Sequence, residues 1–238
     1  MIPWITRGAR FPSPSTALIE PDGLLCAGGD LNPETIINAY SQGIYPWFSN
    51  GQPILWWTPD PRMVLFPGEL RVSKSLAKTR RQHLFTVKFD TAFREVIEGC
   101  AAPREVDGGT WIVKEIQDAY TALHKMGYAH SAESWRDGVL AGGLYGVAIG
   151  RVFFGESMFS RETDASKVAF ASLVEKLTND GFTIVDCQQQ TKHLASFGAR
   201  PISRKDFLAH LIANIEPIAA SSAEAAISAW REVSPHHV

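Results

Sequence analysis

The feature that most constrains the fold of this chain is a pair of short segments in which polar and apolar residues alternate. They are Gly155–Ser160 (GESMFS) and Ile184–Gln188 (IVDCQ). Successive side chains of a β-strand point to opposite faces, so Glu156 and Met158 are predicted to share a face. Asp186 and Gln188 are predicted to do the same. Two acids and an amide are costly to bury among apolar side chains unless partners satisfy them, so the pattern predicts two sheet strands that carry a candidate site.

Length and charge bound the class of protein. The chain has 238 residues, of which 45% are hydrophobic and 20% charged, and its formal net charge is −2. This length allows one large domain or two small ones. A near-neutral balance argues against a general nucleic-acid coat but permits a local basic patch.

Cysteine and histidine spacing gives no indication of a metal site. The three cysteines lie far apart without a CxxC pair, and the seven histidines show no ligand spacing. Neither a disulfide framework nor a zinc site is therefore expected. No charged leader precedes an apolar stretch, and no apolar run reaches about 18 residues. We expect a cytoplasmic protein without metal or membrane segment.

Residues 1–62 are rich in Pro, Gly and Trp and predict a small N-terminal α/β domain. One helix is well delimited, because Asn32 is a capping residue type, Pro33 suits a first turn and Gly43 suits a stop. The rest predicts turns and short strands that end near Thr58–Pro61.

Residues 63–238 predict helices around a mainly antiparallel sheet, which makes the whole an α+β fold. Alternation over 128–160, broken at Asp137-Gly138 and Gly150-Arg151, predicts a three-strand meander. A buried strand is expected over 182–187. Helices are expected at 71–82, 90–99 with Asp90 as cap, 110–126, 165–179 with Asp164 as cap, before Gly198, and from Ser203. Residues after about 216 are Ala/Ser-rich and predict either a helix or a tail.

Asp186 and Gln188 end the buried strand and could bind one partner together. The alternative is a strand end whose polar groups are satisfied by nearby backbone. Proton transfer from an α-ammonium group to an ordinary Asp is uphill by about four pKa units, roughly 5 kcal/mol, so such a pair would orient an amine and relay its proton. Cys187 with His193 could form a thiol nucleophile, but Cys187 is expected on the opposite face.

Five apolar residues could line a pocket beside this pair: Leu144, Met158, Leu173, Leu177 and Val185. The alternative is plain core, because Leu173 and Leu177 follow Ala169 at helical spacing and must pack on the sheet in either case.

A basic stripe falls on one side of the first helix after residue 63, with Arg71, Lys74, Lys78 and Arg81 in register and Arg80 beside them. It is either a solvated face or a stripe that contacts nucleic-acid phosphates. The glycine clusters at 28–29 and 142–146 match neither common phosphate-binding motif.

These segments together resemble the bacterial leucyl/phenylalanyl-tRNA–protein transferases. The resemblance extends over nearly the whole chain up to about Leu211. It is carried by the motifs FPSP (11–14), PDGLL (21–25), GGDL (28–31), GIYPWF (43–48), PILWWTPDPR (53–62), GTWI (109–112), GESMFS (155–160) and DCQ (186–188).

The resemblance implies transfer of Leu or Phe, and Met less well, from aminoacyl-tRNA to the α-amino group of proteins that begin with Arg or Lys. The product is thereby marked for degradation by the N-degron route. The resemblance also implies that residues 63–238 form a domain similar to the GCN5-related N-acetyltransferases. The CoA-binding signature of that superfamily is not evident, which fits a tRNA ester as donor.

The resemblance also implies roles for the candidate residues. Asp186 and Gln188 would act on the attacking amine, and Glu156 would help to recognise the acceptor's N-terminal end. Trp47 and Trp111 would stack around the terminal adenosine, the five apolar residues would hold the Leu or Phe side chain, and the basic helix would contact the acceptor stem. An aminoacyl ester is already activated, so we expect no cofactor, no metal and no covalent intermediate.

Two other classes stay open at this stage. One is an RNA-binding or adaptor module that keeps the fold without catalysis. The other is a CoA-dependent N-acetyltransferase.

Overall fold

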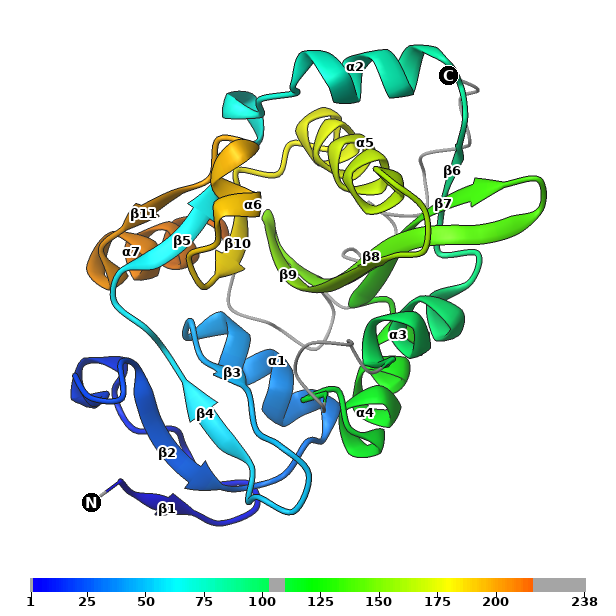
Figure 1. Cartoon of the computed structure of the whole chain (residues 1–238). Helices are drawn as coiled ribbons and strands as arrows, with labels where there is room; N and C mark the ends of the chain where they lie inside the picture. The colour runs from blue at the N-terminus through cyan, green and yellow to red at the C-terminus, as the bar shows by residue number, and fades with distance from the viewer. Residues whose placement is uncertain (1, 103–109, 216–238) are drawn as a thin grey trace.

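The computed structural model describes residues 2–102 and 110–215 of the chain (Figure 1). The expectation for the residues after about 216 lies outside this part. Two sheets with helices packed against them confirm the mixed helix-and-strand fold with mainly antiparallel pairing. The predicted three-strand meander is confirmed as β7 (Ala129–Arg136), β8 (Val139–Ile149) and β9 (Val152–Ser160).

The first sheet belongs to the N-terminal part of the chain. Its strand order is β1-β2-β4-β3, in which β1 and β2 are parallel and the other pairs antiparallel. Its elements are β1 (Trp4–Ile5), η1 (Pro14–Thr16), β2 (Leu24–Gly28), α1 (Pro33–Ser41), β3 (Tyr45–Pro46) and β4 (Leu55–Trp57). Asn32 holds the predicted N-cap position of α1 without a side-chain cap bond, and Gly43 has a φ of +74° after the helix ends.

The second sheet has the strand order β11-β5-β10-β9-β8-β7-β6. The pair β9 and β10 is parallel, and the other neighbours in the described sheet are antiparallel. Besides the meander, its strands are β5 (Arg62–Leu65), β6 (Thr86–Phe89), β10 (Ile184–Gln188) and β11 (Arg200–Ile202).

Helices cover both faces of the second sheet (Figure 1). On one face α5 (Ala165–Asn179) packs on β7 and β8, and α2 (Lys74–Arg81) lies against α5. On the other face α3 (Phe93–Ala101) and α4 (Lys114–Lys125) pack on the sheet, and α1 packs on α4. The remaining helices are η2 (Pro67–Glu69), α6 (Lys192–Ser196) and α7 (Arg204–Asn214).

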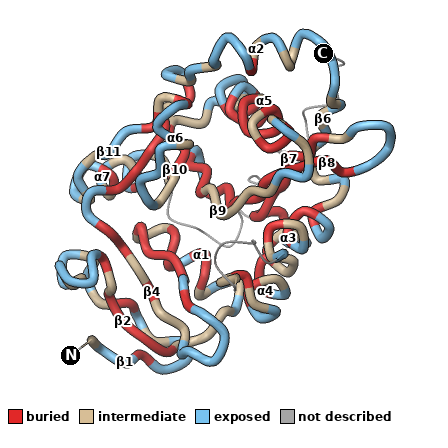
Figure 2. Tube along the Cα trace, in the orientation of Figure 1, coloured by how far each residue is buried: buried red, intermediate tan, exposed pale blue. Residues whose placement is uncertain are grey.

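The core is continuous across residue 62. One buried cluster joins Trp56 of the first sheet and Tyr40 of α1 to Val64 and Tyr145 of the second sheet. A second cluster lies under α5. Figure 2 shows buried backbone running through both sheets. The chain passes from the first sheet to the second between Trp57 and Arg62, and the division at residue 62 stays a prediction.

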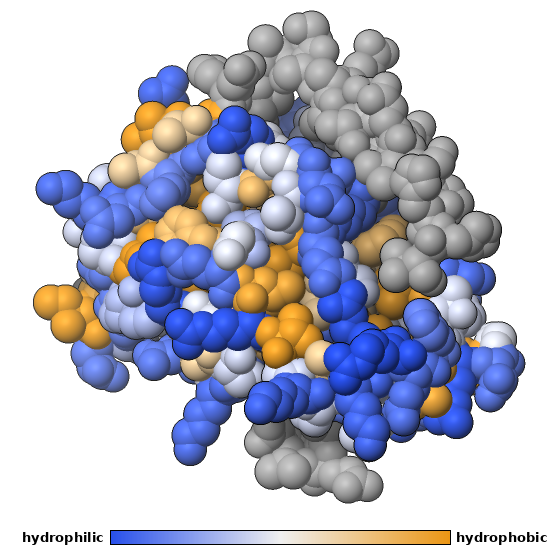
Figure 3. Space-filling model, turned by 90° about the horizontal axis from the view of Figure 1, so that it is seen from above, coloured by the Kyte–Doolittle hydropathy of each residue, from blue (hydrophilic) through white to orange (hydrophobic). Residues whose placement is uncertain are grey.

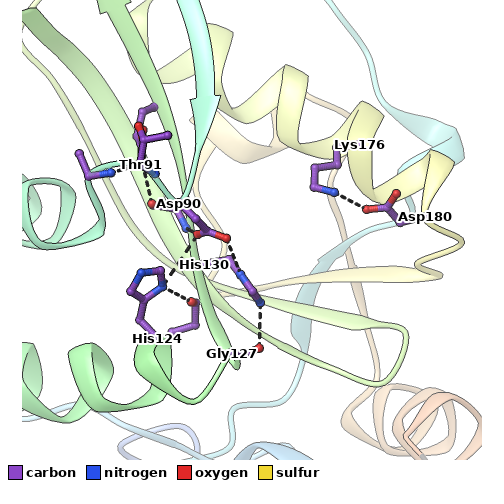
Figure 4. Close-up of polar contacts among 11 residues, drawn as sticks. Asp90, Thr91, His124, Gly127, His130, Lys176 and Asp180 are labelled. Atoms are coloured by element: carbon purple, nitrogen blue, oxygen red, sulfur yellow. Dashed lines mark hydrogen bonds and ion pairs between the residues drawn. The ribbon is translucent and has the colours of Figure 1, made fainter. Parts of the chain in front are cut away.

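Three helix starts lie later in the chain than expected. The helix expected over 110–126 is α4, which begins at Lys114. Asp90 was expected to cap the helix over 90–99, but its carboxylate accepts from the His130 ring and the Ser131 amide, and α3 begins at Phe93 (Figure 4). The amides of Thr91 and Ala92 donate instead to Glu133, at 3.0 and 2.9 Å. A carboxylate from a neighbouring strand therefore anchors the two residues that lead into this helix.

The basic helix begins later than predicted. Ser73 caps it by accepting from the Leu76 amide, so Arg71 precedes α2. Asp164 is the N-cap residue of α5 as expected, but its carboxylate bonds to Lys167 and Thr79 rather than to the helix backbone.

Candidate active site

A cavity opens where two parallel strands diverge. The pairing of β9 with β10 joins Val152–Phe154 to Ile184–Asp186. Beyond these residues lies a cavity of about 840 Å³, lined by residues of both strands that include Glu156, Met158, Asp186 and Gln188. The two segments that the sequence singled out therefore meet at one cavity.

Each of these strands carries a bulge at the cavity. Across β8 and β9, Tyr145 pairs with Ser157 and Gly146 pairs with Gly155, which leaves Glu156 as the extra residue. Across β5 and β10, Val64 pairs with Asp186 and Met63 with Gln188, which leaves Cys187 as the extra residue. A bulge re-aims the side chains that follow it, because the alternation of faces is interrupted.

The bulge in β9 corrects one prediction. Glu156 and Met158 were expected to share a face, but Glu156 points to Tyr40 and Tyr120 on the side of α1 and α4. Met158 packs on the opposite side, against the cluster under α5. Strict alternation fails here because one extra residue shifts the register.

Glu156 is surrounded by neutral donors. Its Oε1 accepts from the Tyr40 hydroxyl at 2.6 Å and from Gln188 Nε2 at 2.9 Å, and its Oε2 accepts from the Tyr120 hydroxyl at 3.1 Å. Burial raises the pKa of the Glu156 carboxyl to about 7, although the two tyrosine hydrogen bonds lower it. The charge of Asp186 adds to the rise and that of Arg62 opposes it. The side chain is partly exposed to the cavity.

Asp186 has a different environment, a fully buried ion pair. Arg62 Nε donates to Oδ1 at 2.8 Å and Arg62 Nη2 donates to Oδ2 at 2.7 Å, with both side chains at 0% exposure. The backbone amide of Gln188 donates to the same Oδ1 at 2.9 Å. The guanidinium also lies 4.7 Å from the Tyr45 ring centre and 4.8 Å from that of Phe207. Asp186 therefore borders the cavity but has its oxygens engaged, and it fixes the backbone that aims Gln188.

Most of the residues that were predicted to hold the aminoacyl side chain or the adenosine line the cavity. Trp47, Trp111, Leu144, Met158 and Val185 do so. Leu173 and Leu177 do not, and at 1% and 0% exposure they belong to the core beneath the wall. Their helical spacing therefore marks core packing, the alternative that the sequence left open. Sequence reasoning missed the aromatic wall residues Tyr145, Phe153 and Phe170.

The basic stripe lies at the edge of the molecule. Arg71, Lys74, Lys78 and Arg81 are exposed. Arg80 is engaged in a two-pronged ion pair with Glu175 of α5, at 2.7 and 2.5 Å. The face seen from above, over α2 and α5, carries hydrophilic side chains with small apolar areas between them (Figure 3).

The Cys187 thiol is poorly suited to act as a nucleophile. Burial and the neighbouring charge of Asp186 raise the pKa of the Cys187 thiol far above its ordinary value. The reactive thiolate is therefore scarce at neutral pH. His193 lines the cavity, and burial lowers its pKa.

The described residues show neither a metal-ligand cluster nor a membrane-spanning helix. Among residues 2–102 and 110–215, no group of three or more His, Cys, Asp or Glu side chains is arranged to hold a metal ion. In the same ranges no helix combines the length and apolar character that crossing a bilayer requires.

Comparison with known sequences assigns the class. The family model described as "Leucyl/phenylalanyl-tRNA protein transferase" matches residues 64–212, and that of its N-terminal domain matches residues 29–60. A relative from Nitrosospira multiformis is 59% identical over 207 residues, which cover 87% of this chain and 89% of the relative. One from Chromobacterium violaceum is 59% identical over 215 residues, covering 90% and 92%. Both are named leucyl/phenylalanyl-tRNA--protein transferase.

These matches define a transferase enzyme. Within that class, the chain belongs to the leucyl/phenylalanyl-tRNA protein transferase family. Among solved structures, a GCN5-related N-acetyltransferase from Kribbella flavida aligns with a TM-score of 0.37 and 14% identity, over 72% of this chain and 62% of the other. A TM-score of this size is too low to carry an argument about this chain.

Proposed function

We propose that this enzyme transfers Leu or Phe, and Met less well, from aminoacyl-tRNA to the α-amino group of proteins that begin with Arg or Lys. The observation that carries the proposal is a single cavity that combines an apolar wall with Glu156 and Gln188. Family membership supports it, because the relatives are named for the aminoacyl-tRNA and protein that they use.

The apolar wall would hold the transferred side chain. Leu144, Met158 and Val185 lie there, with Phe153 and Phe170 beside them. Each buried methylene is worth about 0.8 kcal/mol, so Ala, three carbons short of Leu, should lose roughly 2.4 kcal/mol, or some fifty-fold. Ile equals Leu in size and must be excluded by its branching. In this proposal Leu173 and Leu177 support the wall from behind.

Aromatic and basic groups would hold the tRNA. Trp47 and Trp111 line the cavity and offer ring faces for the terminal adenosine. The exposed residues Arg71, Lys74, Lys78 and Arg81 would contact phosphates of the acceptor stem. Arg80 would reach a phosphate only by leaving Glu175.

The acceptor would enter beside Glu156. A carboxylate at the cavity wall favours the cationic N-terminal end of an Arg or Lys protein. Gln188 would orient the amine through its carboxamide. Asp186 would act through Gln188, because it holds that residue's amide and is itself held by Arg62. The ester is already activated, so the reaction needs proximity, a deprotonated amine and oxyanion stabilisation.

The consequence proposed for the cell is that the new N-terminus marks the product for degradation in the cytoplasm. No cofactor or metal is invoked.

The decisive experiment incubates the full chain with labelled Leu-tRNA and a peptide that begins with Arg. Label should appear at the peptide's N-terminus, and an N-acetylated copy of the same peptide should stay unlabelled. If tRNA is bound but neither Leu nor Phe is transferred, the protein is an adaptor and the proposal is wrong. Transfer of acetyl from acetyl-CoA without transfer from tRNA would show the CoA-dependent alternative.

A further inference from the structure

Three oxygen-bearing side chains form a closed ring at the cavity wall. Tyr40 of α1 contacts Glu156 Oε1 at 2.6 Å, and Tyr120 of α4 contacts Glu156 Oε2 at 3.1 Å. The two tyrosine hydroxyls also contact each other. Both tyrosines are at 0% exposure, whereas Glu156 borders the cavity. The ring therefore has one member that a substrate can reach.

The ring has room for one more proton. It contains three oxygen–oxygen contacts, and each hydrogen bond needs one hydrogen. Two hydroxyls supply two hydrogens, and an ionised carboxylate supplies none. A proton on Glu156 Oε2 fills the third contact by donating to Tyr120, while Tyr120 donates to Tyr40 and Tyr40 donates to Oε1. All contacts of the ring are then satisfied.

We infer that Glu156, held in this ring by Tyr40 and Tyr120, takes the proton from the acceptor's α-ammonium group during transfer. Glu156 is then a catalytic residue, and the two tyrosines are positioning residues. This inference rests on the proposed function and assigns the base of that reaction.

The neighbouring polar groups are less available to an incoming amine. Asp186 is fully buried, and its oxygens accept from Arg62 and from the Gln188 amide. Gln188 directs its Nε2 at Glu156, and an amide is a very weak base. Glu156 has a pKa of about 7. An α-amino group has a pKa of about 7.7–8.0, about one unit above that of Glu156, so the equilibrium constant disfavours proton transfer by a factor of roughly ten. For a Glu with an ordinary pKa the same factor would be several thousand.

The α-ammonium group gives one proton to Glu156 and becomes the free amine. Its nitrogen forms a bond to the ester carbonyl carbon, and the bond from that carbon to the ribose oxygen breaks. The leaving ribose oxygen takes the second proton of the attacking nitrogen. Glu156 returns its own proton to solvent before the next turnover.

Charged and titratable groups from six elements face Glu156 and enter its pH dependence. They are Tyr40 of α1, Tyr45 of β3, Arg62 of β5, Tyr120 of α4, Tyr145 of β8 and Asp186 of β10. Burial raises the pKa of Tyr45 to about 12 and those of Tyr40, Tyr120 and Tyr145 well above their ordinary value. The tyrosines therefore stay neutral through the neutral pH range, whereas Glu156, with a pKa of about 7, changes charge there.

The test measures kcat against pH for the full chain, with saturating Leu-tRNA and saturating Arg-starting peptide. In wild type, kcat should fall as the pH drops below about 7, and this fall is the acid limb of the profile. E156Q keeps the shape of the side chain but cannot take the proton, so kcat should fall by about 100-fold or more. KM for the peptide should change less than kcat does. The part of the kcat profile that reports protonation of the peptide's α-amino group should remain in E156Q.

The tyrosines provide a second readout. Y40F and Y120F each remove a donor to the charged carboxylate, so the acid limb should move to higher pH, with activity recovered at alkaline pH. Y128F is the matched control, because Tyr128 is also a buried tyrosine, at 5% exposure, but does not line the cavity. Its profile should match that of wild type. Thermal unfolding and tRNA binding confirm that each variant is folded.

The outcomes separate this inference from the proposed function. If wild type transfers no Leu or Phe, the proposed function fails and the inference with it. If wild type is active but E156Q raises only KM, or Y40F and Y120F leave the acid limb in place, Glu156 binds the acceptor without taking its proton. In that case only the inference is overturned.

Discussion

Two glutamates on the same sheet, Glu133 of β7 and Glu156 of β9, show how differently a buried acid can be used. Glu133 is at 0% exposure and accepts from the amides of Thr91 and Ala92, the hydroxyls of Thr91 and Ser131, and the Trp135 ring. Glu156 accepts from two hydroxyls and one carboxamide and borders a cavity. Glu133 fastens a helix start to the sheet, whereas Glu156 has an oxygen that can still accept a proton.

Asp186 differs from both glutamates, because it is a buried acid whose partner, Arg62, carries a full charge. The largest effect is expected where that charge is removed. Arg62→Ala would leave Asp186 buried and unpaired, so the free energy of unfolding should fall by about 3 to 5 kcal/mol. Urea unfolding measures it. Arg200→Ala breaks an exposed pair with Glu69 and should cost less than about 1 kcal/mol. Equal losses in the two variants would contradict this view of Asp186.

Glu133→Gln tests whether this acid is purely structural. The amide nitrogen that the substitution introduces would face backbone and hydroxyl donors, so we expect a loss of about 2 to 3 kcal/mol in unfolding free energy. The pH profile of the transfer reaction should keep the wild-type shape. A shifted acid limb in this variant would show that Glu133 is coupled to the reaction.

The pH dependence of stability distinguishes Glu156 from Glu133 more finely. An unfolded Glu gives up its proton near pH 4.5, whereas folded Glu156 does so at about 7. Between these values the folded state binds more protons, so stability should fall as pH rises from 5 to 7.5, by about 2 kcal/mol given the partial exposure. Glu156→Gln should remove this fall. Parallel stability curves for wild type and variant would disprove the raised pKa.

Asp90 should show the opposite sign and the smallest effect. Burial raises the pKa of Asp90, but the hydrogen bonds and charge of His130, together with the Ser131 amide, lower it overall (Figure 4). Its contribution is therefore present at neutral pH and lost as pH falls below about 4. The difference in unfolding free energy between wild type and Asp90→Asn should shrink over that range. A difference that is constant down to about pH 3 would count against the lowered pKa.

The parts of the fold that could be predicted from sequence are those set by local patterns. The Asp137-Gly138 turn marks the hairpin between β7 and β8, and Ser203 caps α7 through the Asp206 amide as its spacing indicates. The short strands β5, β6 and β11 were not predicted. β5 and β11 show no alternation in burial, and β6 alternates over only four residues, which is too short to distinguish a strand from a loop.

The site was predictable in its residue types but not in its pairing. Arg62 and Asp186 are 124 positions apart, and Tyr40 and Glu156 are 116 apart. No local pattern links residues at such distances. The motif that ends at Arg62 was visible, but its charge had no assigned partner. The bulges at Glu156 and Cys187 were hidden for a related reason, since a register shift is a property of two strands and not of one.

The place of Arg62 and Tyr40 has a consequence for how this chain can be divided. A fragment that starts after residue 62 would lack the guanidinium that neutralises Asp186 and the hydroxyl that closes the ring on Glu156. The larger piece would keep both strands that line the cavity, but Asp186 would be left without a counter-charge and Glu156 would keep only its bonds from Tyr120 and Gln188. The two sheets are therefore expected to fold only as one unit.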